Sequence, residues 1–167
     1  MSQQLIAVGT IANDGTGDTL RAAGQKSNAN FTELYTALSA LDVASEFIPT
    51  VTDSGGGRTF TSTVNAARVS NIGNLRWFTA DVSITAASGT SSGQFRISLP
   101  FTALYAVAVK VFGAGLATGA KTALQATIPA GANYVQVDDY ENGGTASLAP
   151  HVQAGTRIVV TGIAFKS

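Results

Sequence analysis

A heptad pattern of apolar and small residues marks the chain between about residues 19 and 41. These residues recur at alternating spacings of four and three, which is typical of a helix that packs along one seam. The seam consists of Leu20, Gly24, Ser27, Phe31, Leu34, Leu38 and Leu41. The pattern predicts a helix roughly 35 Å long at 1.5 Å per residue. Glycine in a helix interior costs about 1 kcal/mol relative to alanine, so the stronger half of the seam runs from Phe31 to Leu41.

The apolar side of this predicted helix needs a partner, because isolated helices persist mainly when one face is packed. One interpretation folds the helix back on the rest of the chain. We expect instead that several copies associate through it, because the helix lies outside the β-rich part of the sequence. The predicted oligomerisation or attachment residues are Leu20, Phe31, Leu34, Tyr35, Leu38 and Leu41. The seam residues alone do not set the number of copies.

The start of the helix carries a capping signal. Asp18 follows Gly17 and precedes the helical pattern. A carboxylate at this place can accept hydrogen bonds from the first backbone N–H groups and favours the positive end of the helix dipole. We therefore predict Asp18 as the helix cap, with Thr16 as the competing residue.

Beyond the small and acidic residues 42–46, the hydrophobic period changes from 3.6 to two. We place a domain boundary there, with an arm and attachment or oligomerisation helix in residues 1–46 and a β module in 47–167. Apolar and polar residues alternate along 78–85 and 95–99, which predicts two half-buried strands. The turn-rich residues 87–93 between them predict a hairpin.

Two further segments, 105–112 and 157–165, are more continuously apolar, as expected of central strands that are covered on both faces. Shorter candidate strands are residues 47–51, 58–64, 67–72, 123–128 and 134–137. About nine strands without an internal repeat favour an antiparallel, jelly-roll-like β-sandwich. The expected fold is mainly β. An extended N-terminal arm and a helix precede the sandwich, and the helices of several copies would form a coiled coil.

Composition excludes several classes of function. The chain of 167 residues has 10 basic and 10 acidic side chains, no cysteine and one histidine. A neutral chain has no electrostatic reason to bind nucleic acid or anionic lipid, and disulfides and thiolate metal sites are impossible. We expect neither a signal peptide nor a membrane span, no cofactor, and a protein that is made in a cytoplasm and stays soluble or assembles there.

Three segments suggest chemistry only superficially. Residues 113–122 are glycine-rich, but Ala120 separates Gly119 from Lys121, and the strand-like residues 123–129 leave no helix N-terminus for a phosphate. The acidic residues in 138–142 lack the spacing of a calcium loop and are expected to form a solvated loop. His151 is not accompanied by a serine or cysteine arrangement in the sequence that would indicate a catalytic base. We therefore expect a protein that is not an enzyme.

Exposed aromatic residues offer a subtler candidate site. Trp77, Tyr105, Tyr134 and Tyr140 could line a shallow sugar-binding face, as in lectin-like sandwiches. Trp77 falls on the polar face of its predicted strand, opposite Phe78. The alternative, which we favour, packs Trp77 at a domain edge or a subunit interface.

Three pieces of the N-terminal region carry a family resemblance: Asn13-Asp14-Gly15-Thr16-Gly17-Asp18, Leu20-Arg21-Ala22 and Asn28-Ala29-Asn30-Phe31-Thr32-Glu33-Leu34-Tyr35. Together they resemble a segment near the N-terminus of structural proteins of tailed bacteriophages, in tail fibres and in baseplate or neck-attached fibres. The resemblance implies a virion protein that is assembled in the host cytoplasm. It also implies three copies, because phage fibres of this kind are usually trimers.

The resemblance further implies the partners, which are other virion proteins of the tail, baseplate or capsid. The preferred function is a short tail-fibre or fibre-adaptor subunit. A capsid decoration or cement protein, and a module that binds a receptor or a host surface glycan, remain as alternatives. An enzyme such as a glycan depolymerase is the least favoured, because it would normally show paired exposed carboxylates in a larger domain.

Overall fold

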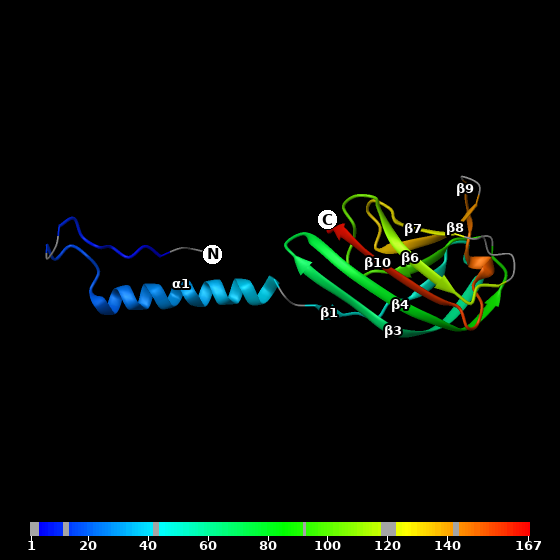
Figure 1. Ribbon diagram of the computed structural model, residues 1–167, viewed down its shortest axis with the longest axis horizontal. Helices are drawn as coiled ribbons and strands as arrows, with labels where there is room; N and C mark the ends of the chain where they lie inside the picture. Colours follow the sequence, from blue (N-terminus) through cyan, green and yellow to red (C-terminus); the bar gives the residue numbers. More distant parts are fainter. Residues whose placement is uncertain (1–3, 12–13, 42–43, 92, 118–122, 142–143) are drawn as a thin grey trace. The chain divides into compact units, whose positions relative to one another are not determined.

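The structure is a computed structural model, which describes residues 4–11, 14–41, 44–91, 93–117, 123–141 and 144–167 (Figure 1). The chain divides into two compact units, Met1–Val43 and Ala44–Ser167. The first is called the arm–helix unit below, and the second the β unit. The division lies slightly before the boundary expected at residue 46, because Ser45 and Glu46 pair with the sheet.

The arm–helix unit contains the predicted helix, α1, over Leu20–Leu41. The predicted cap is wrong. The Thr19 hydroxyl accepts a hydrogen bond of 3.2 Å from the backbone N–H of Ala22, and the Thr19 carbonyl accepts from Ala23, which makes Thr19 the N-cap. The Asp18 carboxylate is instead engaged by Ala7 and Lys26. The short Thr19 side chain is closer to the helix N–H groups, while Asp18 faces the arm.

The β unit is antiparallel throughout its paired strands, which confirms the mainly β prediction. Its strands are β1 (Ser45–Glu46), β2 (Val51–Asp53), β3 (Arg58–Ile72), β4 (Leu75–Gly89), β5 (Phe95–Ser98), β6 (Val107–Ala114), β7 (Ala123–Ile128), β8 (Tyr134–Glu141), β9 (Gly144–Ser147) and β10 (Arg157–Phe165). A short 3₁₀ helix, η1, spans Ala149–His151. The strand order is β1-β3-β4-β10-β6-β7-β8-β5-β2, and β9 pairs with β8.

One continuous sheet forms the two layers of the β unit. The first half of β6, Val107 to Val109, pairs with β7, and its second half, Lys110 to Ala114, pairs with β10. The strand therefore passes from one layer to the other (Figure 1). The inner faces meet in one core, whose largest buried side chains include Phe78, Phe95, Ile84, Ile97, Ile128, Leu148 and Ile158.

The β3–β4 hairpin differs from the sequence prediction. Residues 58–64 and 67–72 were expected to be separate strands, but both lie in β3, which is continuous through a bulge at Asn65. The Asn65 side-chain amide donates to Asp81 and Ser83 on β4, so the bulge keeps a hydrogen-bonded partner. Gly73, with φ of 59°, supplies the left-handed residue of the tight turn between β3 and β4.

The predicted hairpin between residues 78–85 and 95–99 is wrong. Strand β4 pairs with β3 on one side and with β10 on the other, whereas β5 pairs with β2 and β8. Both edges of β4 are thus occupied, and β5 lies in the other layer.

The two continuously apolar strands, β6 and β10, are central, as predicted. The expectation that both of their faces are covered is wrong for this single chain. On the outer face, Phe112, Ile163 and Phe165 are exposed. Their inner neighbours Ile158, Val160 and Ala164 are fully buried.

Candidate assembly surfaces

The seam of α1 is largely exposed in the single chain. Phe31, Leu34 and Leu38 expose 55%, 55% and 58% of their surface, and Leu20 is almost completely exposed. Tyr35 exposes 65%. The side chain of Leu41, the last predicted contact residue, lies outside the described residues. The single chain therefore exposes a row of apolar side chains on α1, which makes this side of the helix the candidate association surface.

The opposite side of α1 is polar and satisfied within the helix. The hydroxyls of Thr32, Thr36 and Ser39 donate to backbone carbonyls four residues earlier, at 2.8 to 2.9 Å. Such hydroxyl groups need no external partner. The apolar seam is consequently the side of α1 that gains most free energy from a partner.

Polar contacts fasten the extended arm to α1. The Asn30 amide accepts from the Gln4 N–H at 2.9 Å and donates to the Gln4 carbonyl at 2.9 Å. The Lys26 ammonium donates to the Leu5 carbonyl at 3.0 Å and pairs with Asp18 at 2.7 Å. Asp18 also accepts from the Ala7 N–H. Held by these contacts, the arm lies back along α1 (Figure 1).

A second acid, Asp14, holds the turn between the arm and the helix. Its carboxylate accepts from the backbone N–H groups of Ile11, Thr16 and Thr10 and from the Thr10 hydroxyl. The hydrogen bonds from Ile11, Thr16 and Thr10 keep the pKa of Asp14 well below its usual range. Gly17 fits the turn because a Cβ there would lie 2.9 Å from the Ala7 carbonyl oxygen.

Asp14, Lys26 and Asn30, whose side chains hold the arm and its turn in place, are called the arm clamp below. They were not identified from the sequence. Each of these three side chains binds backbone groups, and every residue has such groups. A pattern of hydrophobic and polar residues therefore cannot predict these contacts. Asp14 and Asn30 do lie in the pieces that carry the family resemblance, which was the available signal.

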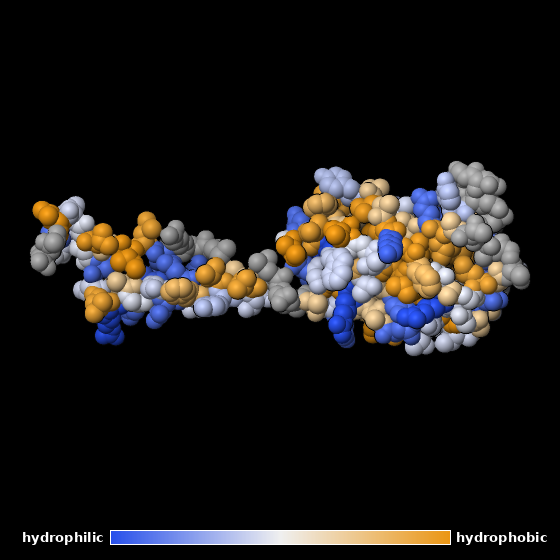
Figure 2. Space-filling view, viewed as in Figure 1, coloured by the Kyte–Doolittle hydropathy of each residue, from blue (hydrophilic) through white to orange (hydrophobic). Residues whose placement is uncertain are grey.

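The β unit carries an apolar outer surface, here called the β4–β10 face. Trp77 on β4 is 56% exposed and pairs with Ile163 on β10, and Leu75 pairs with Phe165. The rings of Phe165 and Tyr105 meet edge to face with centroids 6.4 Å apart. Ile72 and Leu104 adjoin this surface. Figure 2 shows hydrophobic residues reaching the surface of each unit.

The four aromatic residues predicted for a sugar-binding face do not lie together. Trp77 and Tyr105 belong to the β4–β10 face, but Tyr134 and Tyr140 lie on β8 in the other layer. Tyr134 is covered by the Arg96 guanidinium, 4.4 Å from the ring centroid. A single site that uses all four side chains is therefore excluded.

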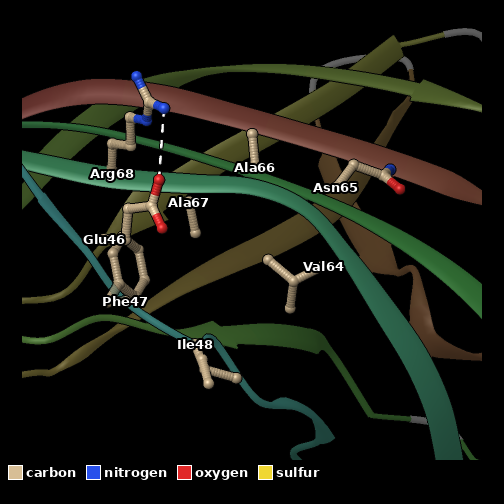
Figure 3. Close-up of a pocket in the computed structure, with 8 residues that line it drawn as sticks. All are labelled: Glu46, Phe47, Ile48, Val64, Asn65, Ala66, Ala67 and Arg68. Atoms are coloured by element: carbon tan, nitrogen blue, oxygen red, sulfur yellow. Dashed lines mark hydrogen bonds and ion pairs between the residues drawn. The ribbon is translucent and has the colours of Figure 1, made fainter.

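A groove opens beside β1 and β3, where the chain after β1 turns away from β3 (Figure 3). Its volume is about 600 Å³, and it is lined by Glu46, Phe47, Ile48, Val64, Asn65, Ala66, Ala67 and Arg68. At its rim Glu46 and Arg68 form an ion pair of 3.3 Å. Both charged side chains are largely exposed, so the pair contributes little stability.

The acidic segment is not the solvated loop that we expected. Asp138 and Asp139 lie on β8 and are buried. Burial raises the pKa of Asp138, while the hydrogen bond from Gln136 and the charge of Arg96 oppose the rise. The side chains of residues 141 and 142 lie outside the described residues.

The structure adds no support for the other chemical signals. In the described residues no group of three or more His, Cys, Asp and Glu side chains could hold a metal ion. Residues 118–122 of the glycine-rich segment are not described, and β7 follows them as a strand. His151 ends η1. No described helix has the length and apolar character needed to cross a membrane.

Known proteins resemble both units. The sequence model of the family described as "Bacteriophage T4 gp9/10-like protein, N-terminal" matches residues 3–92, more than half of the chain. The baseplate wedge protein gp10 of Enterobacteria phage T4 is 35% identical over 98 residues, which cover 59% of this chain and 14% of that protein. The chain therefore spans only about a seventh of this relative's length.

Among solved structures, the Dettilon tailspike protein (gp208) covers 77% of this chain with a TM-score of 0.63 and 15% identity. The match includes 24% of the tailspike chain, and at this identity it establishes similarity of fold alone. The family match confirms the predicted resemblance to virion structural proteins and the location in the virion. The chain belongs to the bacteriophage T4 gp9/10-like N-terminal family.

Proposed function

We propose that this chain is a non-enzymatic tail or baseplate subunit, of the short tail-fibre or fibre-adaptor kind, whose copies assemble as a trimer through α1. The observation that carries the proposal is the exposed seam of Phe31, Leu34 and Leu38. Three apolar side chains at heptad spacing, each more than half exposed, fit a parallel bundle of identical helices. A closed cyclic assembly of copies would bury them without leaving an open end.

In this proposal the two units have different tasks. The arm–helix unit joins the copies, and the β unit contacts other virion proteins through the β4–β10 face. Apolar area surrounded by polar surface is typical of protein interfaces. The zero net charge of the chain supports close approach of copies, because no net repulsion opposes it.

The seam can be tested by two matched pairs of substitutions. Leu34→Asp with Leu38→Asp places two charges in the seam and should reduce the mass in light scattering from three chains to one. Thr32→Asp with Thr36→Asp has the same spacing on the polar side and should leave the mass unchanged. A trimer that survives the first pair would contradict assembly through α1.

The β4–β10 face is better suited to protein than to sugar. Sugar sites combine an aromatic platform with several hydrogen-bonding groups, whereas Trp77 is flanked here by Leu75, Ile163 and Phe165. A glycan array should therefore show no specific binding. Specific binding that Trp77→Ala abolishes and Tyr140→Ala preserves would favour a receptor- or carbohydrate-binding module instead.

Two further alternatives are decided by direct observation. Electron micrographs of particles that lack the protein should lose density at the tail or baseplate, and loss at the capsid surface would favour a decoration protein. Cleavage of a host surface polysaccharide by the purified chain would overturn the proposal that the protein is not an enzyme.

A further inference from the structure

Two apolar features of the arm–helix unit lie outside the seam. Tyr35 follows Leu34 and exposes 65% of its surface. The arm exposes Leu5 by 74% and Val8 by 88%. Neither feature is covered when helices pack only through Phe31, Leu34 and Leu38, so the seam does not account for all of the apolar surface of this unit.

The heptad positions place these features on opposite flanks of the seam. With Phe31 and Leu38 at position a and Leu34 at d, Tyr35 occupies position e. Asn30, which holds the backbone of Gln4, occupies position g. Lys26, which holds the Leu5 carbonyl, lies at position c of the preceding heptad, next to the g flank. The arm therefore runs along one flank and Tyr35 projects from the other.

Parallel bundles bring these two flanks together. In a parallel coiled coil, a g residue of one helix faces the e residue of the next helix five positions later in the sequence. Cyclic symmetry makes the helices of three identical copies parallel. Asn30, with the arm attached to it, therefore faces the partner subunit's Tyr35.

We propose that the arm is a strap between subunits that lies in the outer groove between neighbouring helices, where the partner subunit's Tyr35 packs against the end of the arm that Asn30 holds at Gln4. The inference rests on the proposed trimer. It assigns the occupant as a second copy of this chain, because the e flank and the g flank of the same sequence supply both halves of the contact. In a closed ring of three copies, each arm contacts one Tyr35 and each Tyr35 contacts one arm.

The available area supports such a strap. Phe31, Leu34 and Leu38, together with the almost completely exposed Leu20, could bury only about 500 Å² per copy, whereas a stable interface buries about 800 Å² per partner. The exposed surfaces of Tyr35, Leu5 and Val8 extend the seam on both flanks. The hydrogen bonds of Asn30 and Lys26 hold the arm in place beforehand, which reduces the entropy lost on association.

The absence of cysteine from the chain allows a direct test by cross-linking. The variant with Leu5→Cys and Tyr35→Cys should be joined between subunits by a bismaleimide cross-linker that spans ~12 Å, the rise of about eight helical residues. A non-reducing denaturing gel should show covalent dimers and trimers, because each chain carries both halves of the contact. A direct disulfide would not reach, because it needs Cα atoms about 4.4–6.8 Å apart and the contacts of Lys26 and Asn30 place Leu5 N-terminal to the level of Tyr35. Within one chain the two thiols lie on opposite flanks of the helix, so the cross-linker should not join them.

Two controls separate failure of the strap from failure of the trimer. Leu5→Cys with Thr36→Cys places the second thiol next to position 35 but away from the neighbouring helix, and it should give only monomers. Leu34→Cys alone should give disulfide-linked dimers through the seam. Seam dimers without Leu5–Tyr35 cross-links would overturn the strap and leave the trimer intact. Equal cross-linking of the Thr36 control would also overturn the strap, and absence of every cross-link would overturn the trimer itself.

Discussion

The two units use apolar residues in opposite ways. The β unit encloses a core of large side chains, in which Phe78, Phe95 and Ile97 are almost completely buried between the two halves of its sheet. The arm–helix unit leaves Phe31, Leu34 and Leu38 exposed and holds its arm by polar contacts. The β unit therefore has a core of its own, whereas in our proposal the arm–helix unit completes its burial in an assembly.

The largest expected effect contrasts a core phenylalanine with a seam phenylalanine. Phe78→Ala should destabilise the β unit by about 3–5 kcal/mol, because it removes a ring that packs on Phe101 and leaves a cavity. Phe31→Ala should change the same unfolding transition by less than about 0.5 kcal/mol. Denaturant unfolding followed by Trp77 fluorescence measures both. Equal losses would mean that the two units fold as one, contrary to the comparison.

A smaller effect is expected at the β2–β3 turn, where Asp53 accepts from the N–H groups of Gly55, Gly57 and Arg58. Asp53→Ala should cost about 1–3 kcal/mol, because three backbone donors lose a charged acceptor. Glu46→Ala, at an exposed ion pair, should cost less than about 0.5 kcal/mol.

The Asp53 effect should also depend on pH. Burial raises the pKa of Asp53, but hydrogen bonds from the Ser91 hydroxyl and the turn N–H groups outweigh it, so the pKa is lowered. The stabilisation is then complete above the unfolded pKa of about 3.9 and is lost as the pH falls through the folded value. A difference between wild type and Asp53→Ala that persisted unchanged at pH 2 would contradict this account.

Asp138 should respond in the opposite direction. Its pKa is raised by burial, so its charge destabilises the folded state above the folded pKa, and this penalty is relieved as the pH falls. Asp138→Asn should therefore raise the unfolding midpoint at pH 7 slightly and leave it unchanged near pH 3. Thermal unfolding at both pH values tests this, and a lower midpoint at pH 7 would show that the charge is needed.

The smallest expected effect concerns the arm clamp. Lys26→Met removes the contacts to Asp18 and the Leu5 carbonyl while keeping an unbranched side chain. Amide hydrogen exchange should rise in residues 4–8, while the β unit and its unfolding midpoint stay unchanged. Unaltered exchange in the arm would show that Asn30 and Asp18 hold the arm without Lys26.

The same comparison explains what the sequence could predict. Helix α1 and the strands β4 and β10 repeat their patterns over many residues, so their positions follow from periodicity. The choice of strand partners does not. Alternation along β4 shows that one face is buried, but it does not show that β3 and β10 occupy both edges, and the predicted hairpin with β5 failed for this reason.

The candidate surfaces were predictable to different degrees. Exposure of the seam followed from heptad spacing, and Trp77 was identified because it fell on the polar face of its strand. The β4–β10 face as a whole was not predicted, because Ile163 and Phe165 were expected in a covered strand and Leu75 lay outside the predicted strands. The arm clamp was missed because hydrogen bonds from Asn30 to the Gln4 backbone join residues far apart in sequence.

The most direct test of the account is the mass in solution of the whole chain and of residues 44–167 alone. The whole chain should have three times the 17.0 kDa of one copy. The β unit alone should be a monomer that retains a cooperative unfolding transition. A monomeric whole chain, or a β unit that remains trimeric without the helix, would contradict the claim that α1 joins the copies.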